Sequence, residues 1–419
     1  MLNLRLLIFS PFFPPHVGGL EGYVSDLNDE MMRSRAVDAI TVFAPRLPLE
    51  GSVREEREGG YVVVRYPAIE LIPNFPVPSV WRHEFWKALR STEPSSQDVF
   101  VSHTRFFLSS AFALICARVL SRPLLHVEHG SDFVHLSTRA TQMAARLYDQ
   151  AIGRLLLRHA DGIVAISYAA AGFVKRLAGR DAQVIYRGME VERLDAAIAD
   201  EQVLRFAAGR PVVSFVGRLI DGKGVSDLIH AFAEIPGGLA VLCVVGDGPR
   251  RADLEELARQ LEVAERVIFR GYLLEVQAWG AVRASDVVVN PSYTEGLPTS
   301  VLEAALMGKA VVATDVGGTS EIVSDRRGGL LFPARDRHAL RTLLEDLLTD
   351  PALRSRLGSC ARAEAEGRFD WHASANRFVE VAEALARSRD GGAAHASGAA
   401  GVASSGSEDR ASTSWNTDS

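Results

Sequence analysis

Short runs of apolar residues recur along the chain, and most are continuous rather than alternating with polar residues. Continuous runs of this length are typical of parallel strands that are buried on both faces of a sheet. Helical patterns such as "SDLIHAFAEI" and "DLEELARQLE" separate many of these runs. This succession of strand and helix occurs twice, which predicts an α/β protein with two doubly wound, Rossmann-like domains. The predicted strands are "LRLLIFS", "AITVFAP", "YVVVRYP", "DVFVSH", "PLLHVEHG" and "GIVAIS", then "PVVSFVG", "LAVLCVVG", "RVIFRG", "DVVVNPS", "KAVVAT" and "GGLLF".

The boundary between the two domains is predicted in "RGMEVERLDAAIADEQVLRFAAGRP", which separates the last strand of the first half from the first strand of the second. We therefore assign residues 1–190 to the first domain and residues 191–370 to the second. Residues 389–419 are rich in Gly, Ala and Ser and contain almost no large apolar side chains. Such a tail cannot bury enough surface to offset the entropy of ordering it, so we expect it to be disordered.

Composition and charge narrow the class of protein. A chain of 419 residues is long for one hydrophobic core, and its 47% hydrophobic and 23% charged residues are those of an ordinary globular protein. The net charge of -6 argues against broad nucleic-acid binding. Residues 1–190 hold 21 Lys and Arg against 19 Asp and Glu, so the excess of acid lies in the second half. The first half is thus better suited to an anionic surface or an acidic partner.

The cysteines and the apolar runs indicate the compartment. Cys116, Cys243 and Cys360 are far apart and form no C-x-x-C pair, which argues against a zinc site or a disulfide framework. No apolar run reaches the ~18–20 residues that a transmembrane helix needs. The N-terminal "MLNLRLLIFSPFFPP" ends in a Pro-rich turn rather than a cleavage site, so we interpret it as a strand and not a signal peptide. We expect a cytoplasmic protein.

Two stretches of the first half follow predicted strands and could bind a ligand. In "SPFFPPHVGGLEGYVSDL", Gly18 and Gly19 open a helix and would let the backbone approach an anion; the alternative is a plain turn. In "VEHGSDFV", His129 and Asp132 lie where ligands bind in open α/β sheets; the alternative is a histidine satisfied within a loop. The first stretch is not a G-x-G-x-x-G, which disfavours a dinucleotide cofactor.

Two stretches of the second half are rich in glycine. In "SFVGRLIDGKGV", Arg218 and Lys223 follow a buried strand, and two cations in such a loop suit a diphosphate; the alternative is a pair of solvated surface charges. In "VVGDGPRRADLEEL", Gly246 and Gly248 form a tight turn before a helix, which structural needs alone explain.

The stretch "PSYTEGLPTSVLEAALMGKAVVAT" places two carboxylates around the start of a helix. Glu295 lies in the loop after a buried strand, and a helix is predicted from Pro298 through Glu303 to Met307. The free N–H groups at the start of that helix favour phosphate, and carboxylates accept hydrogen bonds from sugar hydroxyls. A nucleotide sugar meets both needs.

With these motifs in order, the chain resembles a retaining glycosyltransferase of family 4 with the GT-B fold. The resemblance covers nearly all of residues 1–388 and rests on the E-x7-E pair Glu295 and Glu303 together with "GRLIDGKG", "GDGP", "FPPHVGG" and "EHGSDF". It implies two Rossmann-like domains that face each other across a cleft, the first binding the acceptor and the second the nucleotide sugar. It also implies that a helix over residues 371–388 crosses back onto the first domain.

The resemblance also implies roles for individual residues. Arg218 and Lys223 would hold the diphosphate, Glu295 the hydroxyls of the transferred sugar, and Glu303 the ribose. Arg270 would lie near the base, and Gly19 would approach the phosphates from the first domain. The expected catalytic residues are His129, Arg218, Lys223 and Glu295. The expected donor-binding residues are Gly18, Gly19, Arg218, Lys223, Arg270, Glu295, Gly296, Leu297, Pro298, Thr299, Ser300 and Glu303. The expected acceptor-side residues are His103, Arg105 and Asp132.

The chain departs from the family pattern at one turn. Many members have an Asn-Gly-Val-Asp-like sequence after the last strand of the first domain, where this chain has Arg187, Gly188, Met189 and Glu190. The glycine is kept, which predicts that the turn survives. A role of the family's Asn in acceptor binding or as a hinge does not transfer to this chain.

The expected function is metal-independent, retaining transfer of a hexose from a nucleotide-diphosphate sugar to a glycan or lipid-linked acceptor of the cell envelope. The chain has no Asp-x-Asp motif, so we expect no metal-bridged diphosphate, and we expect no cofactor besides the donor substrate. UDP-, GDP- and ADP-sugars stay open as donors. The alternatives are a nucleotide-sugar 2-epimerase-like enzyme, a sugar phosphorylase, and a binding subunit that keeps the fold without activity.

Two basic segments of the first half suit contact with an anionic membrane. One is "VPSVWRHEFWKALR", with Trp81 and Trp86, and the other is "RATQMAARLYDQAIGRLLLRHAD". Basic amphipathic segments fit a lipid-linked acceptor at the inner face of the membrane. The alternative is an ordinary solvated helix face with its tryptophans in the core. The basic or near-basic residues are Arg82, His83, Lys87, Arg90, Arg139, Arg146, Arg154 and Arg158.

Overall fold

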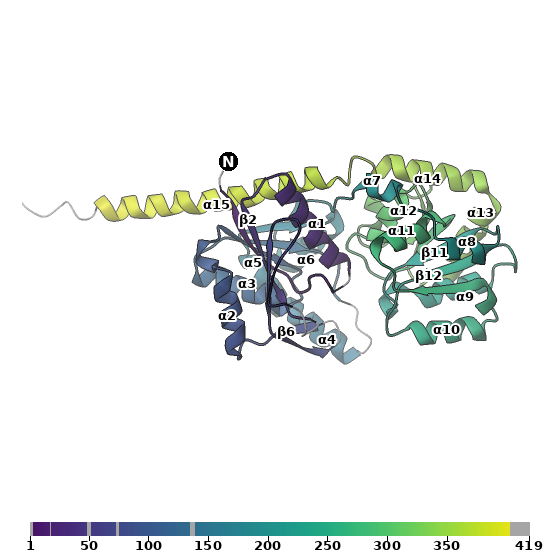
Figure 1. Cartoon of the computed structure of the whole chain (residues 1–419), viewed down its shortest axis with the longest axis horizontal. Coiled ribbons are helices and arrows are strands. Elements are labelled where there is room, and N and C mark those ends of the chain that lie inside the picture. The colour runs from purple at the N-terminus through teal and green to yellow at the C-terminus, as the bar shows by residue number, and fades with distance from the viewer. Residues whose placement is uncertain (1–2, 17, 48–51, 73–74, 135–138, 403–419) are drawn as a thin grey trace, which may run out of the picture.

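The computed structural model describes residues 3–16, 18–47, 52–72, 75–134 and 139–402. Two α/β lobes lie side by side, one built by each half of the chain (Figure 1). The strand pattern read from the sequence is confirmed, since every predicted apolar run contains a strand. Several strands, such as β8, β12 and β15, are buried at every position, as expected for parallel strands covered on both faces.

Within the described residues, the first sheet has eight strands in the order β10-β9-β8-β7-β1-β2-β4-β3. Its neighbours pair in parallel except β3 with β4. A separate hairpin, β5 and β6, follows β4 and was not predicted. The bounds are β1 (Arg5–Phe9), β2 (Ala39–Pro45), β3 (Arg54–Glu56), β4 (Val62–Tyr66), β5 (Ala68–Ile72), β6 (Phe75–Pro78), β7 (Val99–His103), β8 (Leu124–Glu128), β9 (Gly162–Ala165) and β10 (Gln183–Val184).

The second sheet has the order β13-β12-β11-β14-β15-β16 and is parallel throughout its described length. Because all of its strands run the same way, their carboxyl ends meet at one edge, where the following loops gather. The bounds are β11 (Val212–Val216), β12 (Val241–Val245), β13 (Val267–Gly271), β14 (Val287–Asn290), β15 (Ala310–Thr314) and β16 (Leu330–Phe332).

Helices cover both sheets. Those of the first lobe are α1 (Gly19–Arg33), α2 (His83–Ser91), α3 (Leu108–Val119), α4 (Arg139–Tyr148), α5 (Arg154–His159) and α6 (Tyr168–Ala178), with a π-helical turn, η2 (Asp149–Gly153), between α4 and α5. Those of the second are α7 (Val191–Asp195), α8 (Glu201–Ala207), α9 (Val225–Ala233), α10 (Arg251–Gln260), α11 (Glu275–Arg283), α12 (Thr299–Leu306), α13 (Arg337–Thr349) and α14 (Pro351–Ala365).

The last helix, α15 (Trp371–Val402), leaves the second lobe and runs along the first (Figure 1). It packs against α1 through a stripe of buried side chains, among them Trp371, Ala375 and Phe378. The helix is longer than the 371–388 segment expected, so residues 389–402 are helical where we expected disorder. Alanine is the strongest helix former, which allows the helix to continue past its last packed turn. The rest of the expected tail, residues 403–419, lies outside the described residues.

Polar contacts join the two lobes beside the cleft. The Ser131 hydroxyl donates to the carbonyl of Glu295 at 2.5 Å, and the Ser167 hydroxyl donates to the carbonyl of Gly296 at 2.9 Å. The carboxylate of Glu321, in the second lobe, accepts the first two N–H groups of α6 at 2.8 Å each. A negative charge at a helix N-terminus is stabilising, so this carboxylate ties the lobes together. The loops that carry the candidate residues are therefore anchored on both sides.

Candidate active site in the cleft

A cavity of about 660 Å³ lies between the two lobes and is lined by residues of both. Most of its lining comes from loops that follow parallel strands, the position where ligands bind in open α/β sheets. The structure brings twelve of the expected residues together in this lining. They are Gly18, Gly19, His129, Arg218, Lys223, Glu295, Gly296, Leu297, Pro298, Thr299, Ser300 and Glu303. The roles that the resemblance gave them stay predictions.

The glycines at the start of α1 bring the first lobe close to the second. Helix α1 begins at Gly19, and its N-cap, Gly18, has no side chain to cap the free N–H groups. A Cβ atom on Gly18 would lie 2.5 Å from the carboxylate of Glu21, so a larger residue would displace that side chain. A Cβ atom on Gly19 would meet the hydroxyl of Thr299, on the opposite lobe, at 3.6 Å. The uncapped end of α1 thus faces the cleft at close range.

His129 lies at the carboxyl end of β8 and is held from two sides. Its Nε2 atom is 3.1 Å from Nδ1 of His103, and the ring of Tyr23 meets it edge-on with centroids 4.8 Å apart. Burial lowers the pKa of His129 to about 3, so the imidazole is neutral near pH 7. A neutral imidazole can donate or accept one hydrogen bond to a sugar hydroxyl without adding charge.

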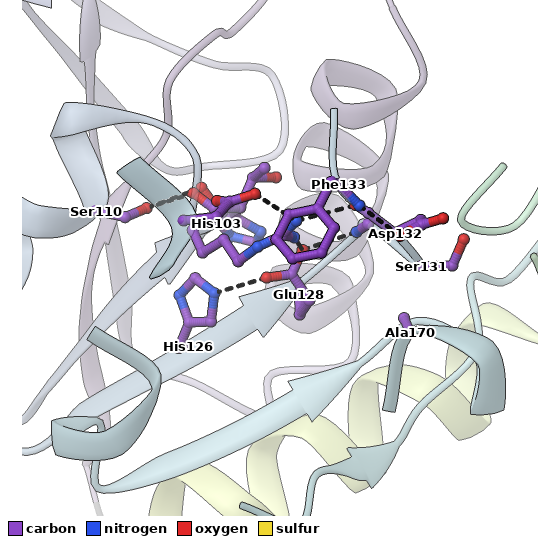
Figure 2. Close-up of polar contacts among 12 residues, drawn as sticks. His103, Ser110, His126, Glu128, Ser131, Asp132, Phe133 and Ala170 are labelled. Atoms are coloured by element: carbon purple, nitrogen blue, oxygen red, sulfur yellow. Dashed lines mark hydrogen bonds and ion pairs between the residues drawn. The ribbon is translucent and has the colours of Figure 1, made fainter. Parts of the chain in front are cut away.

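The loop after β8 rests on a buried ionic network. The Arg105 guanidinium is 1% exposed and pairs with Glu128 at 2.9 Å and with Asp149, in η2, at 3.1 Å. It also donates to the carbonyl of Asp132, while Glu128 accepts the N–H of Gly130. Figure 2 shows the Glu128 carboxylate directed at His126, with Asp132 and Phe133 in the loop beside it. The network fixes the course of the loop that carries His129.

The three expected acceptor-side residues do not line the cavity. Arg105 is committed to the buried network, because a solvent-shielded guanidinium needs counter-charges. His103 is buried and bonds to His129. The Asp132 carboxylate instead accepts the N–H of Phe133 at 2.8 Å. His103 is next to the cavity wall through its contact with His129. The acceptor-side roles of the three residues stay predictions.

The cations of the second lobe stand on the loop after β11. Within the described residues, the exposed Arg218 side chain has no ion-pair or hydrogen-bond partner. Lys223 donates from Nζ to Oε1 of Glu295 at 2.6 Å. This contact depends on Gly224, whose φ is +64° and whose Cβ would lie 2.1 Å from the carbonyl oxygen of Pro291. Because Gly224 lets the two loops touch, Lys223 reaches Glu295.

Helix α12 presents its N-terminus to the cavity. Its N-cap residue, Pro298, offers no side-chain cap, so the N–H groups of Thr299 and Ser300 are available to an anion, whereas Val301 already donates to the Pro298 carbonyl. One turn further in, Glu303 is 9% exposed and accepts the indole N–H of Trp279 at 2.9 Å. Burial raises the pKa of Glu303 to about 7, although the Trp279 hydrogen bond and the charge of Arg187 act in the opposite direction.

Arg270, expected near the base, is not among the cavity-lining residues. Its guanidinium pairs with Asp200 at 2.7 Å and donates to Gln202 at 2.6 Å. The loop after β13 instead contributes Tyr272 and Leu273 to the lining. The sequence therefore located the right loop at the end of β13. Arg270 does not face the cleft, because Asp200 and Gln202, at the start of α8, bind its side chain.

Other lining residues escaped the sequence-based prediction. Gly246 and Asp247, from a turn that we explained by structural needs alone, also face the cavity, as do Tyr23 and Glu275. Asp247 could have been predicted as a site residue from its position just after the end of β12. Arg187 lines the cavity as well, and the only signal for it was its departure from the family pattern.

Among the described residues, no cluster of His, Cys, Asp and Glu is arranged to hold a metal ion. In the same part of the chain, no helix combines the length and the apolar character needed to span a bilayer.

Comparison with known proteins gives consistent matches along the chain. The family model described as "Glycosyltransferase Family 4" matches residues 17–193, and the one described as "Glycosyl transferases group 1" matches residues 197–364. The chain is 32% identical to the uncharacterized glycosyltransferase MJ1069 of Methanocaldococcus jannaschii, over 92% of this chain and 100% of that one. It is 26% identical to a GDP-mannose-dependent alpha-(1-6)-phosphatidylinositol monomannoside mannosyltransferase of Mycolicibacterium smegmatis, over 90% of this chain and 97% of that one.

A solved structure supports the same arrangement. Anabaena Alr3699/HepE, in complex with UDP and glucose, matches with a TM-score of 0.72 at 21% identity, covering 91% of this chain and 100% of that one. This likeness confirms the fold predicted from the sequence, with two Rossmann-like domains and a cleft between them.

Proposed function

We propose, given that this chain belongs to glycosyltransferase family 4 and has the GT-B fold, that it is a retaining hexosyltransferase. It would move a hexose from a nucleotide-diphosphate sugar to a hydroxyl group of a glycan or lipid-linked acceptor, without a metal ion. The observation that carries the proposal is the contact between Lys223 and Glu295 beside the uncapped N-terminus of α12. A cation, a carboxylate and free N–H groups meet there in one cavity.

The cavity offers each part of a nucleotide sugar a chemically suitable partner. The diphosphate would lie against Arg218, Lys223 and the first turn of α12, since all three favour negative charge. The Glu295 carboxylate would accept hydrogen bonds from the hexose hydroxyls, and Glu303 from the ribose hydroxyls. In this arrangement Lys223 would contact both Glu295 and a phosphate oxygen, so it would align the sugar with its leaving group.

In the proposed reaction, the acceptor oxygen forms a bond to the anomeric carbon on the face from which the nucleoside diphosphate departs. The bond between that carbon and the phosphate oxygen breaks, and the departing oxygen takes the proton of the acceptor hydroxyl. Negative charge develops on the diphosphate as this bond breaks. Lys223, held by Glu295, and the N–H groups of α12 are in place before the reaction, so they would stabilise that charge with little reorganisation, and the Arg218 guanidinium would add to them.

The base of the donor stays open among uracil, guanine and adenine. One relative is named as GDP-mannose-dependent, and one structural neighbour holds UDP and glucose. A screen of UDP-, GDP- and ADP-hexoses for slow hydrolysis tests the proposal without a known acceptor. We expect release of nucleoside diphosphate from one class of donor, and much slower release by the Lys223→Ala variant. No release from any donor above that of heat-inactivated protein would contradict it.

The same screen separates the other activities considered. A 2-epimerase-like enzyme would release the nucleotide and free epimerised sugar without needing an acceptor, and a phosphorylase would require inorganic phosphate or yield a sugar phosphate. Analysis of the sugar product by NMR identifies each outcome, including the anomeric configuration that defines retention.

We also propose that the first lobe contacts an anionic membrane surface. Trp81 and Trp86 are 64% and 43% exposed, so they are not core residues, and α2 also carries His83, Lys87 and Arg90. On α4, Met143 and Leu147 are exposed beside Arg146. Exposed aromatic and basic side chains suit the headgroup region. Cosedimentation with vesicles that contain anionic lipid tests this proposal, and equal binding of wild type and a Trp81→Ser/Trp86→Ser variant would contradict it.

A further inference from the structure

Arg187 is a buried cation that faces the cleft from the acceptor-side domain. It follows β10 at the point where the chain begins to cross from the first lobe to the second. Its side chain is 7% exposed and lines the cavity. A guanidinium this deeply buried needs partners for its charge and its N–H groups. The hydrogen-bond and ion-pair partners of Arg187 therefore indicate what kind of ligand it could bind.

The partners of Arg187 lie on both lobes. One terminal nitrogen, Nη2, pairs with the carboxylate of Asp26 on α1 at 2.8 Å. The other, Nη1, donates to the carbonyl of Gly19 at 3.1 Å and to the hydroxyl of Thr299 at 3.3 Å. Gly19 is the first residue of α1, and Thr299 is the first residue of α12. The guanidinium therefore stands between two uncapped helix N-termini, one from each lobe.

These bonds do not use all of the donors of Arg187. A guanidinium carries five N–H groups, and three of them are accounted for by Asp26, Gly19 and Thr299. The Nε atom is buried without a partner among the described residues. One N–H of Nη2 is likewise not used by these bonds. Because the Arg187 side chain lines the cavity, an acceptor bound there would pair with an unused N–H and offset the cost of burying it. An anionic acceptor would gain most, because it would also meet the N–H groups of α12.

The surroundings leave room for this side chain. Gly22 has no side chain at the point where a Cβ would lie 3.3 Å from Nη2 of Arg187. Gly188, the next residue, allows the backbone to pass Trp371, whose N atom would lie 2.3 Å from a Cβ at that position. The Arg187 guanidinium in turn lies over the Trp371 ring, 5.9 Å from its centroid. Its position is therefore fixed by packing as well as by charge.

We propose that Arg187 is a donor-binding residue that contacts the diphosphate of the nucleotide sugar from the acceptor-side domain. It is then the third cation of the leaving-group site, beside Arg218 and Lys223, and the only one of the three that belongs to the first lobe. Because its contacts join Thr299 to α1, a diphosphate bound here would contact both lobes at once. This inference rests on the proposed function, since it assigns a further contact to the same donor.

The competing interpretation is that Arg187 only anchors α1 through its ion pair with Asp26. The two interpretations differ in what the removal of Asp26 does. Under the anchoring interpretation, Asp26→Asn and Arg187→Met both remove the ion pair and act in the same direction. Under donor binding they act in opposite directions, because Asp26→Asn frees the guanidinium for phosphate and removes a neighbouring negative charge.

The experiment measures nucleotide affinity by isothermal titration calorimetry. The probe is whichever of UDP, GDP and ADP the wild type binds most tightly, compared with the corresponding nucleoside monophosphate. Loss of a charge-assisted bond to phosphate lowers affinity by about 10-fold. We expect Arg187→Met to lower diphosphate affinity by this amount with a smaller effect on the monophosphate, Arg187→Lys to lie between, and Asp26→Asn to bind the diphosphate at least as tightly as the wild type.

Two results would overturn the inference. One is an unchanged ratio of diphosphate to monophosphate affinity in Arg187→Met, or in Arg187→Gln if the methionine variant does not fold. The other is a loss in Asp26→Asn equal to that in Arg187→Met. Parallel titrations of Arg218→Ala and Lys223→Ala separate this failure from failure of the proposed function. If they weaken diphosphate binding and Arg187→Met does not, only the role of Arg187 is wrong.

Discussion

At the scale of single residues, Glu295 and Glu303 are held in different ways. Glu295 is paired with a cation, Lys223, whereas Glu303 is buried against the indole of Trp279. Burial favours the protonated form of a carboxyl group, so the surroundings of Glu303 oppose its charge.

The raised pKa of Glu303, about 7, predicts that nucleotide binding strengthens with pH. The ionised carboxylate accepts hydrogen bonds from both ribose hydroxyls, and the protonated form accepts fewer. We expect affinity for the donor nucleotide to rise between pH 6 and pH 8, as measured by calorimetry in buffers of matched ionisation enthalpy. In Glu303→Gln, affinity is expected to be lower at pH 8 and nearly independent of pH. A wild-type affinity that is flat over this range would contradict the ribose assignment.

The raised pKa of Glu303 also predicts that the stability of the fold depends on pH. The folded protein holds the carboxyl proton of Glu303 more tightly than the unfolded chain does. The contribution of this proton to the free energy of unfolding is therefore fully present below pH 4.5 and is lost as the pH rises through about 7. A shift of this size corresponds to about 3 kcal/mol, because each pKa unit is about 1.4 kcal/mol. Glu303→Gln removes the cost of the buried charge, so its free energy of unfolding at pH 8 is expected to exceed that of the wild type. Urea unfolding at pH 6 and pH 8 measures the difference, which would be absent if Glu303 titrated normally.

Lys223 is predicted to matter for turnover more than for folding. Removal of a fixed group that stabilises the leaving group costs about 10²–10³ in turnover. The Lys223–Glu295 pair is partly buried, with side chains 25% and 10% exposed, so its loss costs about 1–3 kcal/mol. We expect Lys223→Ala to show this contrast in donor turnover and in urea unfolding. Lys175, which pairs with Asp181 on the surface of the first lobe at 2.8 Å, is the matched control. Equal turnover of Lys223→Ala and Lys175→Ala would contradict the diphosphate role.

Sequence reasoning located the loops of the site better than it located side chains. The spacing of Glu295 and Glu303 can be seen within one short stretch of sequence, and so can the two cations of "GRLIDGKG". All four of these residues line the cavity. Arg105 and Arg270 lie at equally suitable strand ends, but partners from other segments turn them away. Arg187 is the opposite case, a residue that was not predicted but lines the cavity. Its position there depends on Asp26 and Thr299, which are remote in sequence.

At the scale of elements, the buried strands could be predicted from the sequence, whereas edge strands and tertiary contacts could not. Continuous apolar runs predicted the buried strands, since burial on both faces leaves that pattern in the sequence. The short edge strand β3 and the hairpin of β5 and β6 carry no such pattern, so they could not be predicted from it. The close approach of the 186–190 turn to the start of α15 is likewise a tertiary contact with no local signal.

Gly188 is predicted to set the position of α15. A Cβ atom at this residue would lie 2.3 Å from the backbone nitrogen of Trp371, so Gly188→Ala must push the start of the helix away from the first lobe. Overpacking of this kind costs about 1–3 kcal/mol. We expect a lower thermal midpoint and faster proteolysis of α15. Gly237→Ala is the control, because a Cβ there meets nothing within 4 Å. Equal stability of the two variants would show that the turn can shift freely.

At the scale of the whole molecule, the fold and the cleft were predictable, whereas the relation between the lobes was not. Two runs of βαβ pattern specify two sheets, but nothing in either run specifies how far apart the lobes stand. In the structure, the separation is set by a few side chains that cross the cleft. Glu321 is one of them, and its carboxylate accepts both the N–H groups of α6 and the hydroxyl of Tyr186.

Glu321→Ala is predicted to open the cleft. Its loss leaves Ser167 to cap the N-terminus of α6 and removes the contacts from the second lobe to Tyr168, Ala169 and Tyr186. We expect a larger radius of gyration by small-angle X-ray scattering and a weaker affinity for nucleotide sugar, with little change in helical content. Glu345→Ala, which breaks an ion pair within α13, serves as the control. An unchanged radius in Glu321→Ala would mean that other contacts hold the lobes together.

The path of α15 has a consequence for biosynthesis. Trp371, Ala375 and Phe378 complete the same hydrophobic core as Leu27 and Met31 of α1. During translation, α1 leaves the ribosome among the first segments and α15 among the last. The α1 surface that α15 covers is therefore exposed to solvent and to chaperones until the second lobe has been made. A shortened chain that ends before residue 371 would keep that surface exposed permanently, even though both sheets were complete.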